Sequence, residues 1–468
     1  MKGGLWCLRD LPARLVNIDR DTPLLLPPDL RQWIPDDHLA HYILDAVESL
    51  PLTTLRVNER GTGDEQFPPR MMLGLLIYCY ATGTFSSRAI ERATHTDVAV
   101  RFLAGDTHPD HDTICEFRSQ NRAVLAESFV RVLELARELK LLQLGRITLA
   151  VDGTKVLANA SKHSAVSYQR AGQQIEWLQH EVTQLLAKAE QADSTPLQDG
   201  LSIPAEITRR RDRITHLQAA RAVIEERARQ RAAQERPAYE AQAAERDARR
   251  ARGERVRGRE PQPPRDTPTA KDQFNFTDPD SRIMKAGNGS HFEQAYNAQA
   301  AVETNSPLIV AARVTDAPND KEQLVPSIQA VPPAIRQKVN AVLADNGFYS
   351  AEAVARVEAD SGPTVYAALD KTGHHRSVTD LERKTDPPAP SADAAPSVHM
   401  RHRLQTQAGR ALYRLRQQTV EPVFGIIKEA LGFRRFSLRG LAAVELEWTL
   451  VCLAYNLRRL HRLQVAAA

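Results

Sequence analysis

The sequence has little cysteine and no pattern of cysteines that builds a site. Its four cysteines, Cys7, Cys79, Cys115 and Cys452, lie far apart and form no CxxC pair. This spacing excludes a disulfide framework and a zinc ribbon, and it is typical of proteins from a reducing compartment.

Long apolar runs are missing as well. The run at 71–85 is too short to span a bilayer, and the run at 441–457 contains two glutamates. Charged residues between positions 9 and 14 interrupt any secretory apolar segment. We therefore expect a soluble, cytoplasmic protein.

A large excess of one charge sign is also absent. The 62 Lys and Arg residues nearly balance the 58 Asp and Glu residues, which leaves a net charge of +4. This excludes a polycation that coats nucleic acid, although a balanced total permits local basic surfaces. Hydrophobic residues make up 42% of the 468 positions, which is enough for sizeable cores and predicts two to four domains.

The first 145 residues are predicted to be entirely helical. Apolar residues at helical spacing predict helices at 36–52, 69–80, 86–93, 113–118 and 122–142. No strand pattern interrupts them.

The pattern changes at Arg146, where short runs of β-forming residues begin. Strands are predicted at 147–151, 294–302, 308–314, 339–344 and 364–369, with helices at 321–330, 351–359 and 410–463. We interpret Asp152-Gly153 as the turn that ends the first strand. Strands that alternate with helices predict a mixed α/β domain.

Residues 168–262 do not follow this alternation. Apolar residues repeat at heptad-like spacing on both sides of a break at 193–204, which predicts an antiparallel helical hairpin. From Ala205 to Glu260 there are 16 arginines against 10 acidic residues, an excess of six positive charges. Such an arm can follow a DNA backbone or pair with a second protomer, and a solvated, salt-bridged arm is the alternative. Residues 253–269 are predicted to be a flexible linker, and residues 370–397 a loop or disordered segment.

Three acidic residues stand out by their positions. Asp152 follows the first predicted strand, Asp345 follows the strand at 339–344, and Glu421 lies in a helical pattern. Carboxylates at strand ends are exposed at the edge of a sheet, where they can converge, and a helix that crosses this edge can supply another. Converging carboxylates repel one another unless a cation lies between them, and their oxygens suit Mg²⁺ or Mn²⁺. The local alternatives are a turn-forming role for Asp152 and a helix first-turn role for Glu421 beside Pro422.

Several blocks of the sequence resemble one family. They are LAVDGTKVLANAS, DPDSR with the downstream YNAQAAVE, LADNGFYS, and YRLRQQTVEPVFGIIKEALGFRRFSLRG. In this order they are similar to insertion-sequence transposases of the DDE class, in the IS4/IS5 grouping and nearest its IS1182-like branch. The run from Pro68 to Arg118 also resembles that family's helical N-terminal domain.

The resemblance implies the fold and the domains. The fold would be α/β, with an RNase H-like mixed sheet core, an all-helical N-terminal domain before it and a helical-hairpin insertion within it. The helical DNA-binding domain would span residues 1–145, the two parts of the catalytic core 146–167 and 263–468, and the coiled-coil insertion with its linker 168–262.

The resemblance also implies the site. Its catalytic, metal-binding triad maps onto Asp152, Asp345 and Glu421, which would hold two Mg²⁺ or Mn²⁺ ions. Its tyrosine–arginine–glutamate–lysine signature places Tyr413, Arg416 and Lys428 as DNA contacts. Four residues separate Arg416 from Glu421, where the family usually has three, so Arg414 is a neighbouring candidate. Without the resemblance, these basic residues would be assigned to a solvated helix face.

Other polar residues receive structural interpretations. We expect Asp320 to cap a helix, and Asp278 and Arg282 to shape a turn near the active site. The group His108, Asp110, His111 and Asp112 is interpreted as a turn before a helix. The histidines 374, 375, 399 and 402 lie in a proline-rich loop without cysteines, which makes a zinc site the weaker interpretation. Trp448 is assigned to the core.

For DNA binding, the first helices can present a helix-turn-helix-like surface. The candidate phosphate contacts are Arg88, Arg92, Arg101 and Arg118, and an ordinary helical bundle is the alternative.

The function we expect is cleavage and transfer of the DNA strands of an insertion sequence, by a dimer or larger oligomer near the nucleoid, with terminal repeats and target DNA as partners. The rivals are an RNase H-like nuclease that does not join strands, and a catalytically silent DNA-binding protein derived from a transposase.

Overall fold

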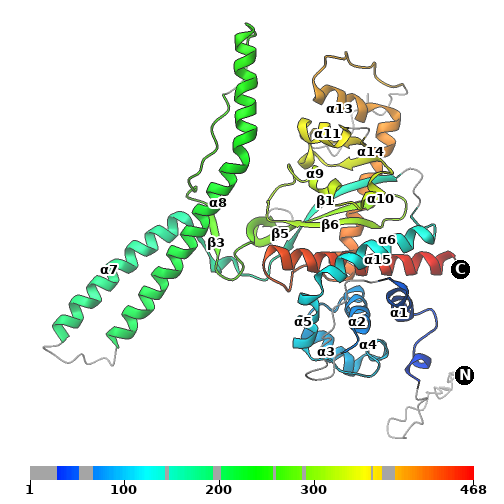
Figure 1. The fold of residues 1–468 in the computed structure, drawn as a ribbon, viewed down its shortest axis with the longest axis horizontal. Helices are drawn as coiled ribbons and strands as arrows, with labels where there is room; N and C mark the ends of the chain where they lie inside the picture. The colour runs from blue at the N-terminus through cyan, green and yellow to red at the C-terminus, as the bar shows by residue number, and fades with distance from the viewer. Residues whose placement is uncertain are drawn as a thin grey trace, which may run out of the picture.

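The computed structural model describes residues 29–51, 67–142, 147–192, 202–256, 260–286, 291–359, 362–370 and 385–467. The chain builds a helical N-terminal part, a central sheet covered by helices, and a long helical arm that projects to one side (Figure 1).

The N-terminal part is helical throughout its described residues, as predicted. Its elements are the 3₁₀-helix η1 (Leu30–Trp33) and the helices α1 (Leu39–Ser49), α2 (Pro69–Ala81), α3 (Ser87–Thr96), α4 (Val98–Leu103), α5 (His111–Gln120) and α6 (Arg122–Glu138). Helix α2 begins with Pro69 in its first turn, where the missing N–H has no cost, and is buried along most of its length. Helix α4 was not predicted, because six residues are too few to show a helical period.

A six-stranded mixed sheet forms the centre of the molecule. Its strands are β1 (Ile147–Leu157), β4 (Arg282–Ala286), β5 (His291–Glu303), β6 (Ile309–Thr315), β7 (Val339–Ala344) and β8 (Thr364–Ala367). Along the sheet the order is β4, β5, β1, β7, β8, and β6 pairs with β5. Strands β1, β5 and β6 are antiparallel neighbours, whereas β1, β7 and β8 run parallel. The mixed α/β core is confirmed.

Strand β1 is longer than predicted, and the prediction of a turn at Asp152-Gly153 was wrong. The strand continues through both residues to Leu157 because β5 pairs with it along this stretch, with Asp152 opposite Ala300 and Gly153 opposite Gln299. Asp152 therefore lies in the middle of a strand that is paired with β5, one residue beyond the stretch that pairs with β7.

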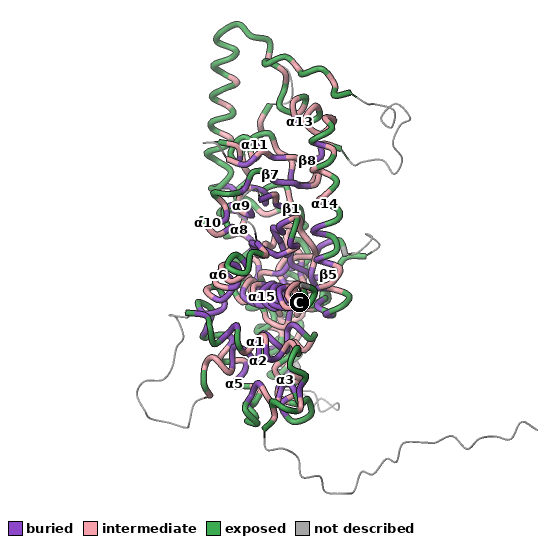
Figure 2. The backbone as a smooth tube through the Cα atoms, turned by 90° about the vertical axis from the view of Figure 1, so that its right-hand side faces the viewer, coloured by how far each residue is buried: buried purple, intermediate pink, exposed green. Residues whose placement is uncertain are grey.

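Helices cover the sheet. They are α9 (Leu324–Gln329), α10 (Pro333–Arg336), α11 (Ala351–Glu358), α13 (Pro396–Gln405), α14 (Gln407–Gly425) and α15 (Leu441–Ala467), with a π-helical turn, η5 (Ile426–Ala430), after α14. Helix α15 is buried over most of its length between the sheet and the N-terminal helices (Figure 2). Trp448 on α15 is fully buried and donates from Nε1 to the carbonyl of Gln299 at 3.0 Å, which confirms its place in the core.

The described part of the predicted 370–397 loop contains no strand and only the first two residues of a helix. Helix α13 begins at Pro396, with proline in its first turn, so the interpretation of His399 and His402 as loop residues was wrong.

The arm is the predicted antiparallel hairpin of α7 (Tyr168–Ala192) and α8 (Ile203–Ala251). Apolar side chains from both helices, including Ile175 and Leu217, form a separate small core at its base. The short strands β2 (Ala165–Ser167) and β3 (Gln273–Asn275) pair there and tie the arm to the sheet. The break between the helices lies almost entirely outside the described residues.

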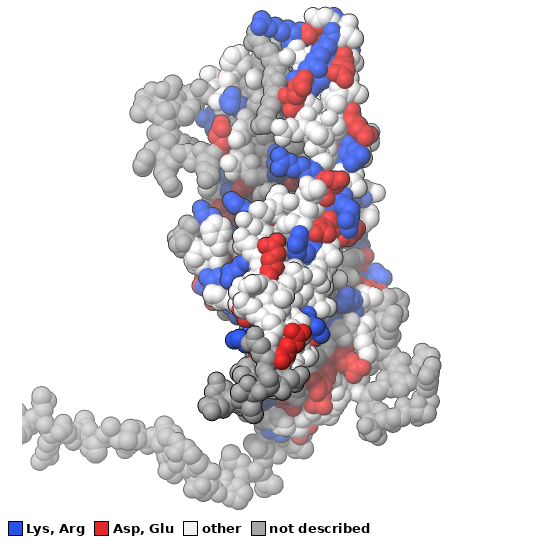
Figure 3. Space-filling model, turned by 90° about the vertical axis from the view of Figure 1, so that its left-hand side faces the viewer, with Lys and Arg blue, Asp and Glu red and all other residues white. Residues whose placement is uncertain are grey.

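Positive and negative side chains are mixed along the arm (Figure 3). Several arginines of α8 pair with glutamates one turn away, such as Arg209 and Arg210 with Glu206 at 2.7 Å. These pairs belong to the salt-bridged arm that was the alternative interpretation, and a role in DNA binding stays a prediction. Within the described part of the chain, none of the helices has the length and apolar character needed to cross a bilayer.

Candidate active site

Asp152 and Asp345 lie next to each other on neighbouring strands. Strands β1 and β7 run parallel with Val151 opposite Ala344, the last residue of β7, and Asp152 and Asp345 follow directly after this pair. Neighbouring strands lie about 4.8 Å apart, so the two carboxylates face the same side at close range. Asp345 also begins the short 3₁₀-helix η3 (Asn346–Phe348), where its Oδ1 accepts from the Gly347 N–H at 2.8 Å.

The charge of Asp152 is opposed by its surroundings. Its side chain is only 17% exposed. Burial first, and then the negative charge of Asp345, raise the pKa of Asp152 to about 7, while the positive charge of Arg416 lowers it. Two negative charges at a buried position repel each other, and a nearby cation would stabilise both ionised carboxylates.

Arg416 supplies positive charge at this point. It projects from α14 and is 11% exposed, with Nη1 donating to Asp152 Oδ2 at 3.2 Å and Nη2 lying 3.6 Å from Glu421 Oε1. Its guanidinium carbon lies 6.0 Å from the centre of the Tyr413 ring. Arg414 is exposed, with no ion pair among the described residues. The contacts therefore favour Arg416 over Arg414.

Glu421 lies nearer to solvent than the two aspartates. It follows Val420 on α14, and its side chain is 55% exposed. Helix α14 packs against β1 and β5 here. The β5 residues opposite Asp152 and Thr154 are Ala300 and Ala298, whose small side chains leave room for the helix. Arg416 links Glu421 to Asp152, so the three predicted acids belong to one connected cluster.

Lys428 is anchored to β1. The π-helical turn η5 carries it, and its Nζ donates to Thr154 Oγ1 at 2.5 Å and to the Lys155 carbonyl at 2.9 Å. Burial, followed by the charge of Arg434, lowers its pKa. Glu421 lies on the α-helix itself and Lys428, seven positions later, on the π turn that follows it.

Asp320 does not cap a helix, contrary to the prediction. Its Oδ1 accepts from the side-chain amides of Asn297 at 2.7 Å and Gln299 at 2.6 Å. It lies against Gly153, where an added Cβ would be only 2.5 Å from that oxygen. The N-cap of α9 is Gln323 instead. Asp320 therefore lies beside the aspartate pair, a position that its helix-like local sequence did not reveal.

These oxygens form a donor set that hard divalent cations prefer. In the described ranges, no group of three or more His, Cys, Asp or Glu side chains is arranged to hold a metal ion. The adjacent aspartates, with the raised pKa of Asp152, still fit a divalent cation, because its charge would relieve their repulsion.

The histidine-rich segments have structural roles where they are described. His402 contacts the carbonyl of Pro387 at 3.0 Å, and Asp110 caps α5 by accepting from the Thr113 N–H at 2.6 Å. The turn interpretation of the segment around Asp110 is confirmed. His374 and His375 lie outside the described residues.

Asp278 shapes a turn, as predicted. It is buried and accepts from the Tyr296 hydroxyl at 2.8 Å and from the Gly440 N–H at 3.1 Å. It thereby fixes the loop before α15 against the sheet.

Of the four N-terminal arginines, Arg118 is misassigned. It is buried, and its Nη1 donates to the Tyr80 hydroxyl at 2.7 Å within the core, so it offers no surface to DNA. Arg88 and Arg92 on α3 are exposed, and Arg101 pairs with Asp106 at 2.6 Å. The phosphate contacts of Arg88 and Arg92 stay predictions.

Two family models match the sequence. "Transposase DDE domain" matches residues 263–457, and "Transposase domain (DUF772)" matches residues 28–120. No curated protein and no solved structure gives a significant match. Asp152 lies between the two matched ranges, yet β1 pairs with β5 and β7, both inside the DDE domain. The arm separates β1 from β5 and β7 in the sequence, but all three strands belong to one sheet in the fold. An RNase H-like core with an insertion has this arrangement.

Proposed function

Because the chain belongs to the DDE transposases of insertion sequences, of the IS1182-like type, we propose that it cuts the 3′ ends of its element and joins them to target DNA. The fit of Asp152 and Asp345 carries this proposal. They come from segments 193 positions apart and face the same side of neighbouring parallel strands.

Each residue of the cluster has a proposed role. Asp152, Asp345 and Glu421 would hold two Mg²⁺ or Mn²⁺ ions, which when bound polarise the scissile phosphate and activate the attacking water or 3′-OH. Arg416 lowers the pKa of Asp152 against the effect of burial, and it offers a guanidinium fork to a phosphate. Tyr413 packs beside Arg416 and keeps it over the carboxylates.

Lys428 contributes differently from a free phosphate ligand. Its ammonium holds the turn after α14 on β1 through Thr154 and the Lys155 carbonyl. This anchoring fixes the helix that carries Arg416 and Glu421 relative to the strand that carries Asp152. An ammonium has three N–H donors and these two contacts use two of them, so we assign Lys428 both positioning and phosphate contact.

The DNA partners are proposed to be the terminal repeats and the target, handled by a homodimer or larger oligomer. Two ends must be processed together, which one catalytic site does not accomplish alone. The N-terminal helices and the arm are the candidate surfaces for holding these ends.

The decisive experiment replaces Asp345 by Asn. This nearly isosteric change removes one negative charge, so cleavage of end DNA in Mg²⁺ should fall below detection while binding of the same DNA is retained. Wild-type cleavage by the variant would exclude this site. Pre-cut ends incubated with target DNA then separate the transposase from a nuclease, because only the transposase yields joined products.

A further inference from the structure

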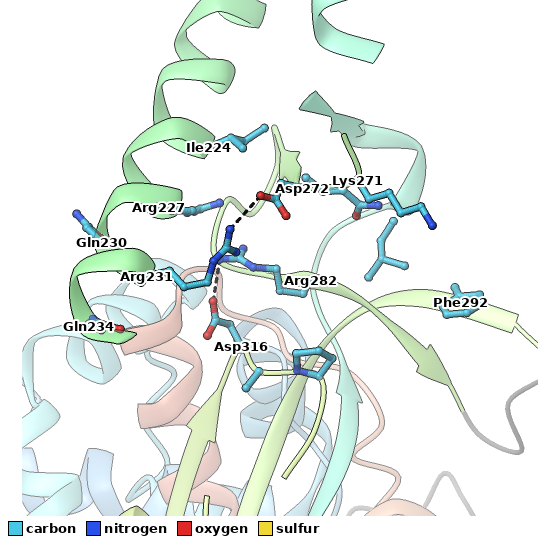
Figure 4. Close-up of a pocket in the computed structure, with 14 residues that line it drawn as sticks. Ile224, Arg227, Gln230, Arg231, Gln234, Lys271, Asp272, Arg282, Phe292 and Asp316 are labelled. Atoms are coloured by element: carbon cyan, nitrogen blue, oxygen red, sulfur yellow. Dashed lines mark hydrogen bonds and ion pairs between the residues drawn. The ribbon is translucent and has the colours of Figure 1, made fainter. Parts of the chain in front are cut away.

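A cavity of about 710 Å³ lies where the arm meets the sheet (Figure 4). Its walls come from α8, from β3 and the residues before it, from β4, from the start of β5 and from the loop after β6. None of the residues proposed for catalysis lines it. It is therefore a separate feature of the molecule, and nine of its 14 lining residues are polar or charged.

Positive charge exceeds negative charge in this lining. Its cations are Arg227, Arg231, Lys271 and Arg282, whereas its only acids are Asp272 and Asp316. Arg231 lies 3.3 Å from Asp272 and Arg282 lies 2.7 Å from Asp316. Figure 4 shows these two arginine side chains converging from α8 and β4. The two pairs use both acids and leave two cations over.

The two remaining cations are Arg227 and Lys271. Arg227 donates from Nη2 to the Pro279 carbonyl at 2.9 Å, but its Nη1 is buried and has no hydrogen-bond partner among the described residues. A buried N–H without an acceptor is unfavourable, and an anionic oxygen would satisfy it. Lys271 is exposed and forms no ion pair within the described ranges. Arg227 Nη2 also lies 3.5 Å from Asp280 Oδ1, so the unmet donor of Arg227 is Nη1, whereas Lys271 has no carboxylate partner in the described part of the chain.

The cavity also lies close to the aspartate pair along the chain. Asp316 lines the cavity, and only four residues later Asp320 packs against Gly153, the neighbour of Asp152. Four residues span at most about 14 Å. Since one strand of duplex DNA rises about 3.4 Å per nucleotide, this upper limit corresponds to about four nucleotides.

We propose that this cavity binds the phosphodiester backbone of the element's end, within about four nucleotides of the cleaved bond, an inference that rests on the proposed function. Lys271 and Arg227 contact phosphate oxygens there. Phe292, which is 57% exposed at the rim, offers an apolar face to a deoxyribose or a base. The arm thereby acts as one wall of a DNA site.

The test compares two charge reversals in the full-length chain. Lys271→Glu changes the cavity without breaking an ion pair of the described residues. Lys338→Glu makes the same charge change at an exposed position before β7, the end of that strand opposite Asp345. Affinity for a fluorescent duplex that carries the terminal repeat is measured by anisotropy without divalent ions, over a range of salt concentrations.

We expect Lys271→Glu to weaken binding about tenfold and to make the slope of log K against log salt shallower by about one, with Lys338→Glu near wild type. Replacing single phosphates by neutral methylphosphonates then locates the contact: one substitution near the cleaved bond should weaken wild-type binding but not that of Lys271→Glu. Equal affinities and slopes for the two variants would mean that the cavity does not bind DNA and that its ion pairs only join the arm to the sheet. Because binding is read without cleavage, this failure is distinct from retained activity in Asp345→Asn.

Discussion

Arg416 donates a hydrogen bond to Asp152 at 3.2 Å across the interface between α14 and β1. The same guanidinium lies 3.6 Å from Glu421, so one fixed positive charge serves two of the three proposed metal ligands. A divalent cation must therefore compete with this guanidinium for the carboxylate oxygens.

The competition predicts that Arg416→Ala binds Mn²⁺ more tightly in the absence of DNA. Loss of a partly buried ion pair worth about 1 kcal/mol corresponds to roughly a fivefold gain in affinity. DNA cleavage should nevertheless fall by about 10²-fold, because a phosphate-binding group is lost. Calorimetric titration at pH 8.5, where Asp152 is ionised, measures the affinity.

Arg414→Ala is the matched control, since this neighbour is exposed on the same helix. It should leave both Mn²⁺ affinity and cleavage unchanged. Weaker Mn²⁺ binding by Arg416→Ala would mean that the arginine orients the carboxylates for the metal and does not compete with it.

The raised pKa of Asp152 predicts a pH-dependent stability. Burial and Asp345 raise this pKa from 3.8 to about 7, so the folded state favours the protonated form. The stability that this group contributes is present at pH below about 4 and is lost as pH rises through 7. The difference in unfolding free energy between wild type and Asp152→Asn should therefore decline across this window by up to roughly 4 kcal/mol.

Urea denaturation of both proteins between pH 4 and 8.5, without divalent ions, measures this difference. Mn²⁺ should restore the wild-type stability more at pH 8 than at pH 6, because metal binding requires the ionised carboxylate. A difference that stays constant with pH would show that Asp152 titrates as an ordinary aspartate.

The aspartate pair could be predicted from the sequence, because local runs of β-forming residues mark the two strands that bring the aspartates together. Runs of β-formers mark the paired stretches of β1 and β7, and each aspartate is the polar residue that follows such a run. The length of β1 is not local: Asp152-Gly153 has the composition of a turn, and only pairing with β5 keeps it extended.

The contacts of Arg416, Lys428 and Asp320 depend on tertiary packing. The rotation of α14 decides which arginine reaches Asp152, and the π turn that carries Lys428 has no recognisable sequence signal. Asp320 follows a strand and precedes a helix, so capping is its natural local interpretation. Its actual partners, Asn297 and Gln299, lie on β5 more than twenty residues earlier.

Arg118 is predicted to act on stability and not on DNA. Its guanidinium donates to Tyr80, whose hydroxyl in turn donates to the buried Glu447 at 3.2 Å. Burial raises the pKa of Glu447, and the charge of Arg118 opposes this rise. Arg118→Met leaves that carboxylate without its positive neighbour, so unfolding free energy should fall by about 3 kcal/mol.

Arg92→Ala provides the contrast, since Arg92 is exposed on α3. Its stability should change by less than about 0.5 kcal/mol, while affinity for end DNA decreases if α3 faces the duplex. Urea denaturation and anisotropy measured below the melting transition separate the two effects. Unchanged stability in Arg118→Met would contradict the buried network.

Lys428 tests whether its main role is anchoring. Its ammonium donates to Thr154 Oγ1 and to the Lys155 carbonyl, and both contacts hold the turn after α14 on β1. Lys428→Met keeps the apolar stem but removes these donors, so unfolding free energy should fall by about 1–3 kcal/mol. Thr154→Val should cost less by itself, and the double variant should cost less than the sum of the two, because they share one hydrogen bond. Urea denaturation of the four proteins measures this coupling.

Lys338→Met, at an exposed site, is the control for loss of a lysine charge. If Lys428→Met lowers DNA affinity with no loss of stability and no coupling to Thr154, the lysine is a free phosphate ligand and the anchoring role is wrong.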